Sequence, residues 1–160
     1  MQTRHRRSLG LALTIVATLL SVSSCTRKDL PEGDPRRRLE DYVRTSFNVR
    51  DVGDREKLLG FLTAGAKNRL AAWSDEQFRQ AFIDSKRQFL TLSIREVKSV
   101  SPSQTNLTYE LSYVDQGRGN EARVTNKRMT EMVLEQGHWM IREVHNIKEL
   151  VEYKNEMSLP

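Results

Sequence analysis

Residues 107–113, Leu-Thr-Tyr-Glu-Leu-Ser-Tyr, carry the clearest structural signal in the chain. Leu107, Tyr109, Leu111 and Tyr113 alternate with Thr, Glu and Ser, and a period of two places the two sets of side chains on opposite faces of a β-strand. One face of this strand is therefore apolar and aromatic, and the other is polar. Such a strand is typical of an antiparallel sheet that buries one face and leaves the other in water.

The same alternation extends to both sides of this strand. Residues 90–100 precede this strand and residues 122–135 and 138–145 come after it, and all three segments are predicted strands. Turns are predicted at residues 101–103, 117–120 and 136–137. Short polar turns between alternating strands favour an antiparallel meander. We expect its apolar face to pack on helices.

N-terminal to the strands, the hydrophobic period changes to that of an α-helix. Residues 36–50 place Leu39, Tyr42, Val43 and Phe47 on one stripe. Further short helices are predicted at residues 55–62, 67–73 and 75–86, the last opened by the capping-box pattern Ser74-Asp75-Glu76-Gln77. The sequence therefore predicts an α+β fold, with N-terminal helices packed on a curved antiparallel sheet of three to four strands.

Two smaller features complete the predicted domain, which spans residues 36–157. In the tail, residues 147–156, the apolar side chains recur at helical spacing, so it is either a closing helix or a frayed end. Trp73 and Trp139 are interpreted as core anchors, because buried aromatic rings supply much of the area of a small core.

The first 25 residues have the three zones of a secretory signal. Arg4, Arg6 and Arg7 precede an uncharged run at residues 9–22, and small residues then precede Cys25. The run has 14 residues, whereas a membrane-spanning helix needs about 20. A cleaved signal is therefore favoured over an uncleaved anchor.

Val22-Ser23-Ser24-Cys25 resembles the lipobox of bacterial lipoproteins. The resemblance implies cleavage after Ser24 and acylation of Cys25, which would anchor the chain to a lipid bilayer. Residues 1–24 are then the signal peptide, and residues 25–35, which are polar and contain Pro and Gly, are a flexible tether. Thr26 stands where an Asp would resemble an inner-membrane retention signal, so the resemblance implies the periplasmic face of the outer membrane.

Processing would also remove most of the excess positive charge. The chain has 26 basic and 21 acidic side chains, a net charge of +5, and residues 1–24 hold three of the arginines and no acid. The mature part therefore has 23 basic and 21 acidic side chains, or +2. Its one basic run, Arg36-Arg37-Arg38, is flanked by Asp34, Glu40 and Asp41, which argues against a nucleic-acid partner.

The order of elements resembles the nuclear transport factor 2-like superfamily of cone-shaped α+β domains. The residues that carry the resemblance are Asp54, Lys57, Leu58, Leu59, Phe61, Leu62 and Thr63, then Ser74 and Phe78, and finally Gly137, Trp139 and Ile141. The resemblance implies a sheet curved around the first helix. It implies no single activity, because this fold holds both enzymes and binding modules.

Enzymes of that superfamily use an acidic base and a tyrosine or second acid inside the cone. Tyr109 and Tyr113 share a strand face and Tyr42 lies on the first helix's stripe, so these three are candidate pocket-lining residues, against the alternative that they only pack. Glu110 is predicted to be exposed because it alternates with the apolar face. No catalytic residue is assigned.

Neither a metal site nor a cofactor is predicted. His138 and His145 remain after processing, with no second cysteine or clustered carboxylate to complete a ligand set. His138 follows Gly137 and is predicted in a surface turn, and His145 has no obvious partner. Phosphate-binding glycine loops and hydrolase motifs are also absent from the sequence.

Two functions remain open at the level of sequence. The favoured one is a non-enzymatic accessory domain, anchored in the cell envelope, that binds a small apolar ligand or a protein partner, with a homodimer as one form of partnership. The alternative is a small enzyme of the isomerase, dehydratase or cyclase type that uses a pocket inside the cone. A buried carboxylate beside the tyrosines would favour the enzyme.

Overall fold

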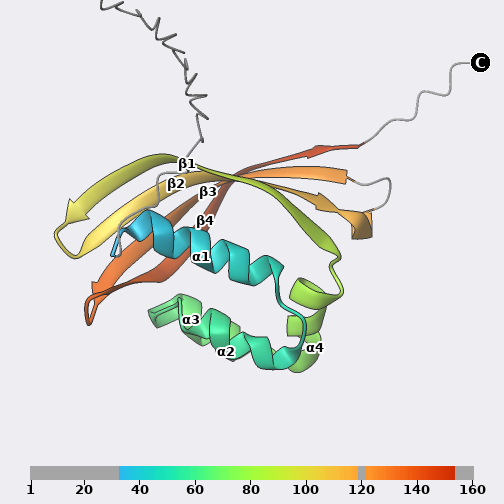
Figure 1. The fold of residues 1–160 in the computed structure, drawn as a ribbon, viewed down its shortest axis with the longest axis horizontal. Helices are drawn as coiled ribbons and strands as arrows, with labels where there is room; N and C mark the ends of the chain where they lie inside the picture. The colour runs from blue at the N-terminus through green and yellow to red at the C-terminus, as the bar shows by residue number, and fades with distance from the viewer. Residues whose placement is uncertain (1–32, 119–121, 154–160) are drawn as a thin grey trace, which may run out of the picture.

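The computed structural model describes residues 33–118 and 122–153. Helices occupy the N-terminal half and strands the C-terminal half of this part of the chain (Figure 1). The predicted α+β class is thus confirmed, with the helices preceding a four-stranded antiparallel sheet. The predicted signal peptide, Cys25 and most of the predicted tether lie outside the described residues, and their assignment stays a prediction.

The helical half consists of one long helix and several short ones. Their bounds are α1 Pro35–Phe47, η1 Val52–Asp54, α2 Arg55–Leu59, α3 Ala64–Ala71, α4 Asp75–Phe78 and the π-helical turn η2 Arg79–Ile83.

Local sequence fixes where two of these helices begin. Asp34 caps α1, accepting a hydrogen bond from the Arg36 N–H at 2.8 Å, and Pro35 occupies the first turn, where no N–H is needed. The predicted capping box of Ser74 and Gln77 is formed at the start of α4.

The sheet is a meander in the order β1-β2-β3-β4. The strands are β1 Arg87–Ser101, β2 Gln104–Asp115, β3 Ala122–Glu135 and β4 His138–Glu152, and η3 Gln116–Arg118 follows β2. Figure 1 shows the sheet as an arch over α1, with the other helices on the same side. The inner face of this arch, toward the helices, presents the alternate residues Leu107, Tyr109, Leu111 and Tyr113, all buried as the sequence predicts.

The curvature of the sheet has a specific cause in its two outer strands. The β2–β3 ladder runs without a register shift, whereas β1 has three and β4 has two. Each shift leaves one residue of the outer strand without a paired residue on the neighbouring strand. These unpaired residues are Leu90, Arg95, Val100, Arg142 and Ile147. Such β-bulges bend the strand that holds them and increase its twist.

The β3–β4 connection is a two-residue hairpin loop. Gln136 and Gly137 both have positive φ, +51° and +81°. Two successive positive φ values define the tight turn that matches the twist of paired strands, and glycine adopts this conformation without steric cost.

The prediction for the tail is wrong. Residues 147–152 form neither a helix nor a frayed end, because β4 continues to Glu152, which pairs with Arg123. Ile147 is the extra residue of a bulge, so the strand's alternation is interrupted there. The resulting spacing of apolar residues imitates a helix.

Hydrogen bonds tie the helical half to β4. The Thr63 N–H donates to the Ile141 carbonyl at 2.9 Å, and the Ile141 N–H donates to the Phe61 carbonyl at 2.9 Å. Arg38 of α1 donates through Nε to the Trp139 carbonyl at 3.1 Å. Ile141, itself fully buried, thus joins the backbone of the α2–α3 connection to the sheet.

Within the described part of the chain, no helix is both long enough and apolar enough to cross a membrane.

Candidate functional site

A cavity of about 380 Å³ lies between the C-terminal part of α1, the η2 turn and the inner face of the sheet. Its volume falls within the range of small-molecule sites. Its wall is formed by Tyr42, Val43, Ser46, Phe47, Trp73, Gln80, Ala81, Phe82, Ser85, Arg87, Tyr109, Leu111, Tyr113, Asp115, Arg118 and Arg128.

The structure brings the three candidate tyrosines together on this wall. Tyr42 comes from α1, and Tyr109 and Tyr113 from β2. Burial raises the pKa of Tyr42 to about 12, with Tyr109 adding to the rise and Arg128 and Arg87 opposing it. Burial also raises the pKa of Tyr109, against the charge and hydrogen bonding of Arg128. Both phenols therefore stay protonated at neutral pH and remain available as hydrogen-bond donors.

Aromatic rings form the apolar part of the wall. The Phe47 ring lies 5.7 Å from the Tyr113 ring, and the Trp73 ring lies 6.1 Å from the Phe82 ring. The prediction of Trp73 as a core anchor is wrong, because the residue is 37% exposed. Trp73 follows the end of α3, and its side chain lines the cavity while remaining partly exposed to solvent. Trp139 is half-buried and packs against the core, as predicted.

Arg87 is held in place at the start of β1. Its Nε donates to Ser85 Oγ at 3.0 Å, and its Nη2 donates to the Ala81 carbonyl. The guanidinium also lies 5.7 Å from the centre of the Tyr113 ring and 5.8 Å from that of Phe47. Both distances lie within the range of cation–π attraction. The charge is thus fixed among aromatic rings.

Arg128 lies on β3 directly opposite Tyr109 of β2. Its Nε atom is buried and has no hydrogen-bond partner among the described residues. In the orientation of the Asn126 amide that gives hydrogen-bond partners to both its oxygen and its nitrogen, Arg128 Nη2 donates to the amide oxygen at 3.1 Å. The amide nitrogen of Asn126 then donates to Glu149 Oε2 at 2.9 Å.

The carboxylates near the cavity are both engaged by a third arginine. Arg118 forms ion pairs with Asp115 at 3.2 Å and with Glu149 at 3.1 Å. In residues 33–118 and 122–153, neither Arg87 nor Arg128 forms an ion pair with a carboxylate. The three arginines and two acids carry a formal charge of +1, and the excess lies with Arg87 and Arg128.

This geometry does not suit proton abstraction. Asp115 is the one carboxylate on the described part of the wall. Its Oδ1 accepts from the Gly117 N–H at 3.1 Å, and its Oδ2 faces Arg118. A general base must reach the proton of its substrate, whereas both oxygens of this carboxylate are held at the turn after β2. Glu110, half-buried on the other face, pairs with Arg95.

Sequence reasoning missed Arg87 and Arg128, although a signal for Arg128 was present. Alternation from Val124 to Met132, both fully buried, passes through Arg128 on the same face. An arginine at an inward position of a strand departs from the apolar pattern and marks a residue that needs explanation. Arg87 precedes the clear alternation of β1 and gave no comparable signal.

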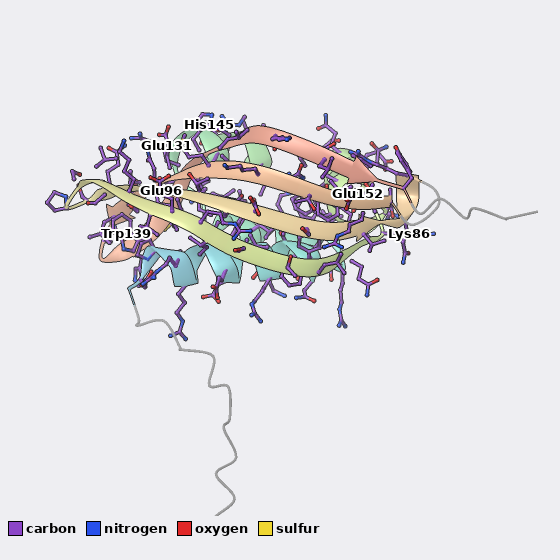
Figure 2. All side chains as sticks on the ribbon, turned by 90° about the horizontal axis from the view of Figure 1, so that it is seen from above. Lys86, Glu96, Glu131, Trp139, His145 and Glu152 are labelled. Carbon is purple, nitrogen blue, oxygen red and sulfur yellow. The ribbon has the colours of Figure 1, made fainter. Side chains whose placement is uncertain are left out.

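The histidines lie away from the cavity. His138 is exposed at the β3–β4 turn, as expected. His145 does have a partner, contrary to expectation, because its Nε2 lies 3.3 Å from Glu131 Oε1. Figure 2 looks onto the outer face of the sheet, away from the helices, and shows His145 and Glu131 there on neighbouring strands. No group of three metal-ligating side chains occurs among the described residues.

Comparison with known proteins gives little beyond general likeness. No family model matches the sequence, and no curated protein matches it significantly. Among solved structures, a SEC-C motif containing protein from Rhodopseudomonas palustris is 14% identical, with a TM-score of 0.47 over 71% of this chain and 75% of that one.

Two further structures show a similar level of likeness. The VirB8 protein of Agrobacterium tumefaciens is 9% identical, with a TM-score of 0.47 over 79% of this chain and 97% of that one. The intermembrane space region of the chloroplast protein ARC6 is 20% identical, with a TM-score of 0.46 over 72% of this chain and 98% of that one. Because these three TM-scores are below 0.5, the function must be argued from the residues of this chain.

Proposed function

We propose that this chain is a lipid-anchored protein of the bacterial cell envelope whose α+β domain binds a small ligand without transforming it. The observation that carries the proposal is the cavity of about 380 Å³ with three tyrosines on its wall. A pocket with aromatic walls and a few converging polar groups is the usual form of a small-molecule site.

The contacts of Asp115 favour a binding role over an enzyme of the isomerase, dehydratase or cyclase type. An enzyme of that type needs a carboxylate directed at its substrate. Asp115 instead binds the Gly117 N–H and Arg118. The tyrosines that remain are hydrogen-bond donors, which can orient a ligand but cannot accept its proton while they are protonated.

The anchoring part of the proposal rests on the sequence of residues 1–25. Acylation of Cys25 would tether the domain to a bilayer by residues 25–35, on the periplasmic face of the outer membrane. Intact mass of the membrane-extracted protein should show a chain that begins at Cys25 with added acyl groups. Cys25→Ser should yield an unmodified precursor, and a mature wild-type chain with a free Cys25 would refute the anchor.

Ligand binding is tested with the two tryptophans of the chain. We would titrate the protein with three probes of one shape, 4-phenylbutyrate, 4-phenyl-1-butanol and 4-phenylbutylamine, and record tryptophan fluorescence. Trp73 lines the cavity and Trp139 does not. A ligand in the cavity should therefore change the emission of Trp139→Phe, which keeps Trp73, and leave that of Trp73→Phe unchanged.

The outcome discriminates between occupancy of this cavity and binding elsewhere. A saturable response to at least one probe, lost in Trp73→Phe and kept in Trp139→Phe, supports the proposal. A response that survives in Trp73→Phe places the probe elsewhere, and no response to any of the three contradicts a small-ligand function.

A further inference from the structure

We infer that the ligand of this cavity is an organic anion, whose negative group binds between Arg87 and Arg128 and whose apolar body contacts the aromatic wall. The inference rests on the proposed ligand-binding function and specifies its chemical class. The sequence had suggested a small apolar ligand, and the charges on the wall change that expectation.

The first argument is the uncompensated charge. Arg128 points inward from the middle strand β3, with its Nε buried and without a hydrogen-bond partner among described residues. Burying a charged group is unfavourable unless a counter-charge and hydrogen bonds accompany it. The nearby acids Asp115 and Glu149 both bind Arg118 instead. A negative group on the ligand would supply the missing partner of Arg128.

The second argument is the fixed position of Arg87. Contacts with Ser85 and the Ala81 carbonyl hold its Nε and Nη2 in place. A guanidinium fixed before binding loses little conformational entropy when it receives a carboxylate or phosphate, which its planar donors match. The ring of Tyr113 at 5.7 Å lies against the same guanidinium. The anion would therefore enter a site that is already formed.

The third argument is the composition of the rest of the wall. Phe47, Phe82, Leu111 and Trp73 offer apolar surface, and Tyr109 offers a protonated hydroxyl beside Arg128. Such a wall suits an aliphatic or aromatic body attached to the anion. A bare inorganic ion would leave this surface unused.

The experiment compares the three phenylbutyl probes, which differ only in the charge of the head group, and adds inorganic phosphate. Affinities are measured by calorimetry on the full chain in a mild detergent. We expect the carboxylate to bind at least tenfold more tightly than the alcohol, and the ammonium to bind more weakly than both. A hydrogen bond to a charged group contributes about 1.5–3 kcal/mol, which corresponds to roughly a 10- to 100-fold change in affinity.

The matched variants are Arg128→Met on the inner face of β3 and Arg123→Gln on its outer face. Each removes one positive charge from the same strand. Arg128→Met should weaken carboxylate binding by about 10- to 100-fold and leave alcohol binding unchanged, whereas Arg123→Gln should change neither. The melting temperature of ligand-free Arg128→Met should stay close to that of the wild type, because removal of an uncompensated charge offsets loss of the hydrogen bond to Asn126.

Three results would overturn the anion inference while leaving a ligand-binding function intact. They are equal affinity for the alcohol and the carboxylate, full carboxylate affinity in a folded Arg128→Met, and phosphate binding as tight as that of phenylbutyrate. Loss of folding in Arg128→Met would show that the charge is structural and would also count against the inference. Failure of all three phenylbutyl probes to bind the wild type would remove the proposed function itself.

Discussion

The two ends of the inner face of the sheet are built from the same strands but differ in chemistry. At the end near the β3–β4 turn, Leu107, Met132 and Ile141 are each 0% exposed and belong to the apolar core. Toward the other end, Arg128 in the middle of β3 and Asp115 at the end of β2 occupy inward positions, and the space beside them is the cavity. We call these the packed end and the cavity end. The packed end supplies stability, so that the cavity end can keep polar residues that stabilise the fold poorly.

The largest effect on stability is expected from Leu107→Ala at the packed end. Because Leu107 is fully buried, the variant should lose about 2–5 kcal/mol of unfolding free energy, the usual cost of such a truncation. Chemical denaturation measures the loss. Leu90→Ala, at a bulge where the residue is 37% exposed, serves as the control and should cost less than about 1 kcal/mol. Equal losses would show that the packed end is not the source of stability.

The next test follows the tyrosines of the cavity end with pH. The pKa of Tyr42 is raised from its ordinary value of 10 to about 12. The folded state therefore favours the protonated phenol, and this contribution is complete below pH 10 and is lost as the pH rises from 10 toward 12. The fall is on the order of 1–2 kcal/mol for this half-buried ring.

Denaturation midpoints between pH 8 and 12 measure this fall, and Tyr109, whose pKa is also raised, adds to it in the same direction. Tyr42→Phe should flatten the curve in that range. Tyr153→Phe, at a site that is 55% exposed, should leave it unchanged. A flat wild-type curve would mean that Tyr42 is in effect solvated.

A smaller effect is expected from the cap of α4, which leads into the η2 turn of the cavity wall. Ser74 accepts from the Gln77 N–H at 3.2 Å, and Ser74→Ala should cost about 1 kcal/mol of unfolding free energy. Ser74→Asp retains an acceptor at this position and should restore most of the loss. If Ser74→Ala also weakens binding of the phenylbutyl probes, the cap supports the cavity as well as the fold.

The smallest effect should come from the outer face of the sheet. Arg95 and Glu110 form an ion pair at 2.6 Å in which the arginine side chain is 57% exposed. A double-mutant cycle with Arg95→Gln and Glu110→Gln should give a coupling of about 0.2–1 kcal/mol that decreases with salt. A coupling far above that range would mean that the outer face contributes to stability as the packed end does.

Sequence periodicity predicted the strands and helices of both ends because local physics determines them. The alternation of Leu107 to Tyr113, the capping box at Ser74 and the turn at Gly137 each depend on residues close in the chain. Periodicity also placed the three tyrosines on surfaces that face one another across α1 and β2. It did not show that a cavity separates them.

The wrong prediction for the tail has a specific physical origin, which is a β-bulge. An extra residue reverses the alternation after it, so Ile147 and its neighbours imitated a helix. The position of a bulge depends on pairing between strands distant in sequence, which no local window contains. The fixing of Arg87 depends likewise on Ala81 and Ser85, which the η2 turn brings next to the start of β1.

The same bulges affect how the sheet meets other chains. β1 and β4 have one partner each in the order β1-β2-β3-β4, so each leaves a row of backbone N–H and C=O groups that could template an added strand. All five extra residues lie in these two strands and none in β2 or β3. Each bulge interrupts the regular spacing of those groups, so an incoming strand meets only short regular stretches. The irregularities that curve the sheet over its cavity therefore also protect a two-edged sheet from edge-to-edge aggregation.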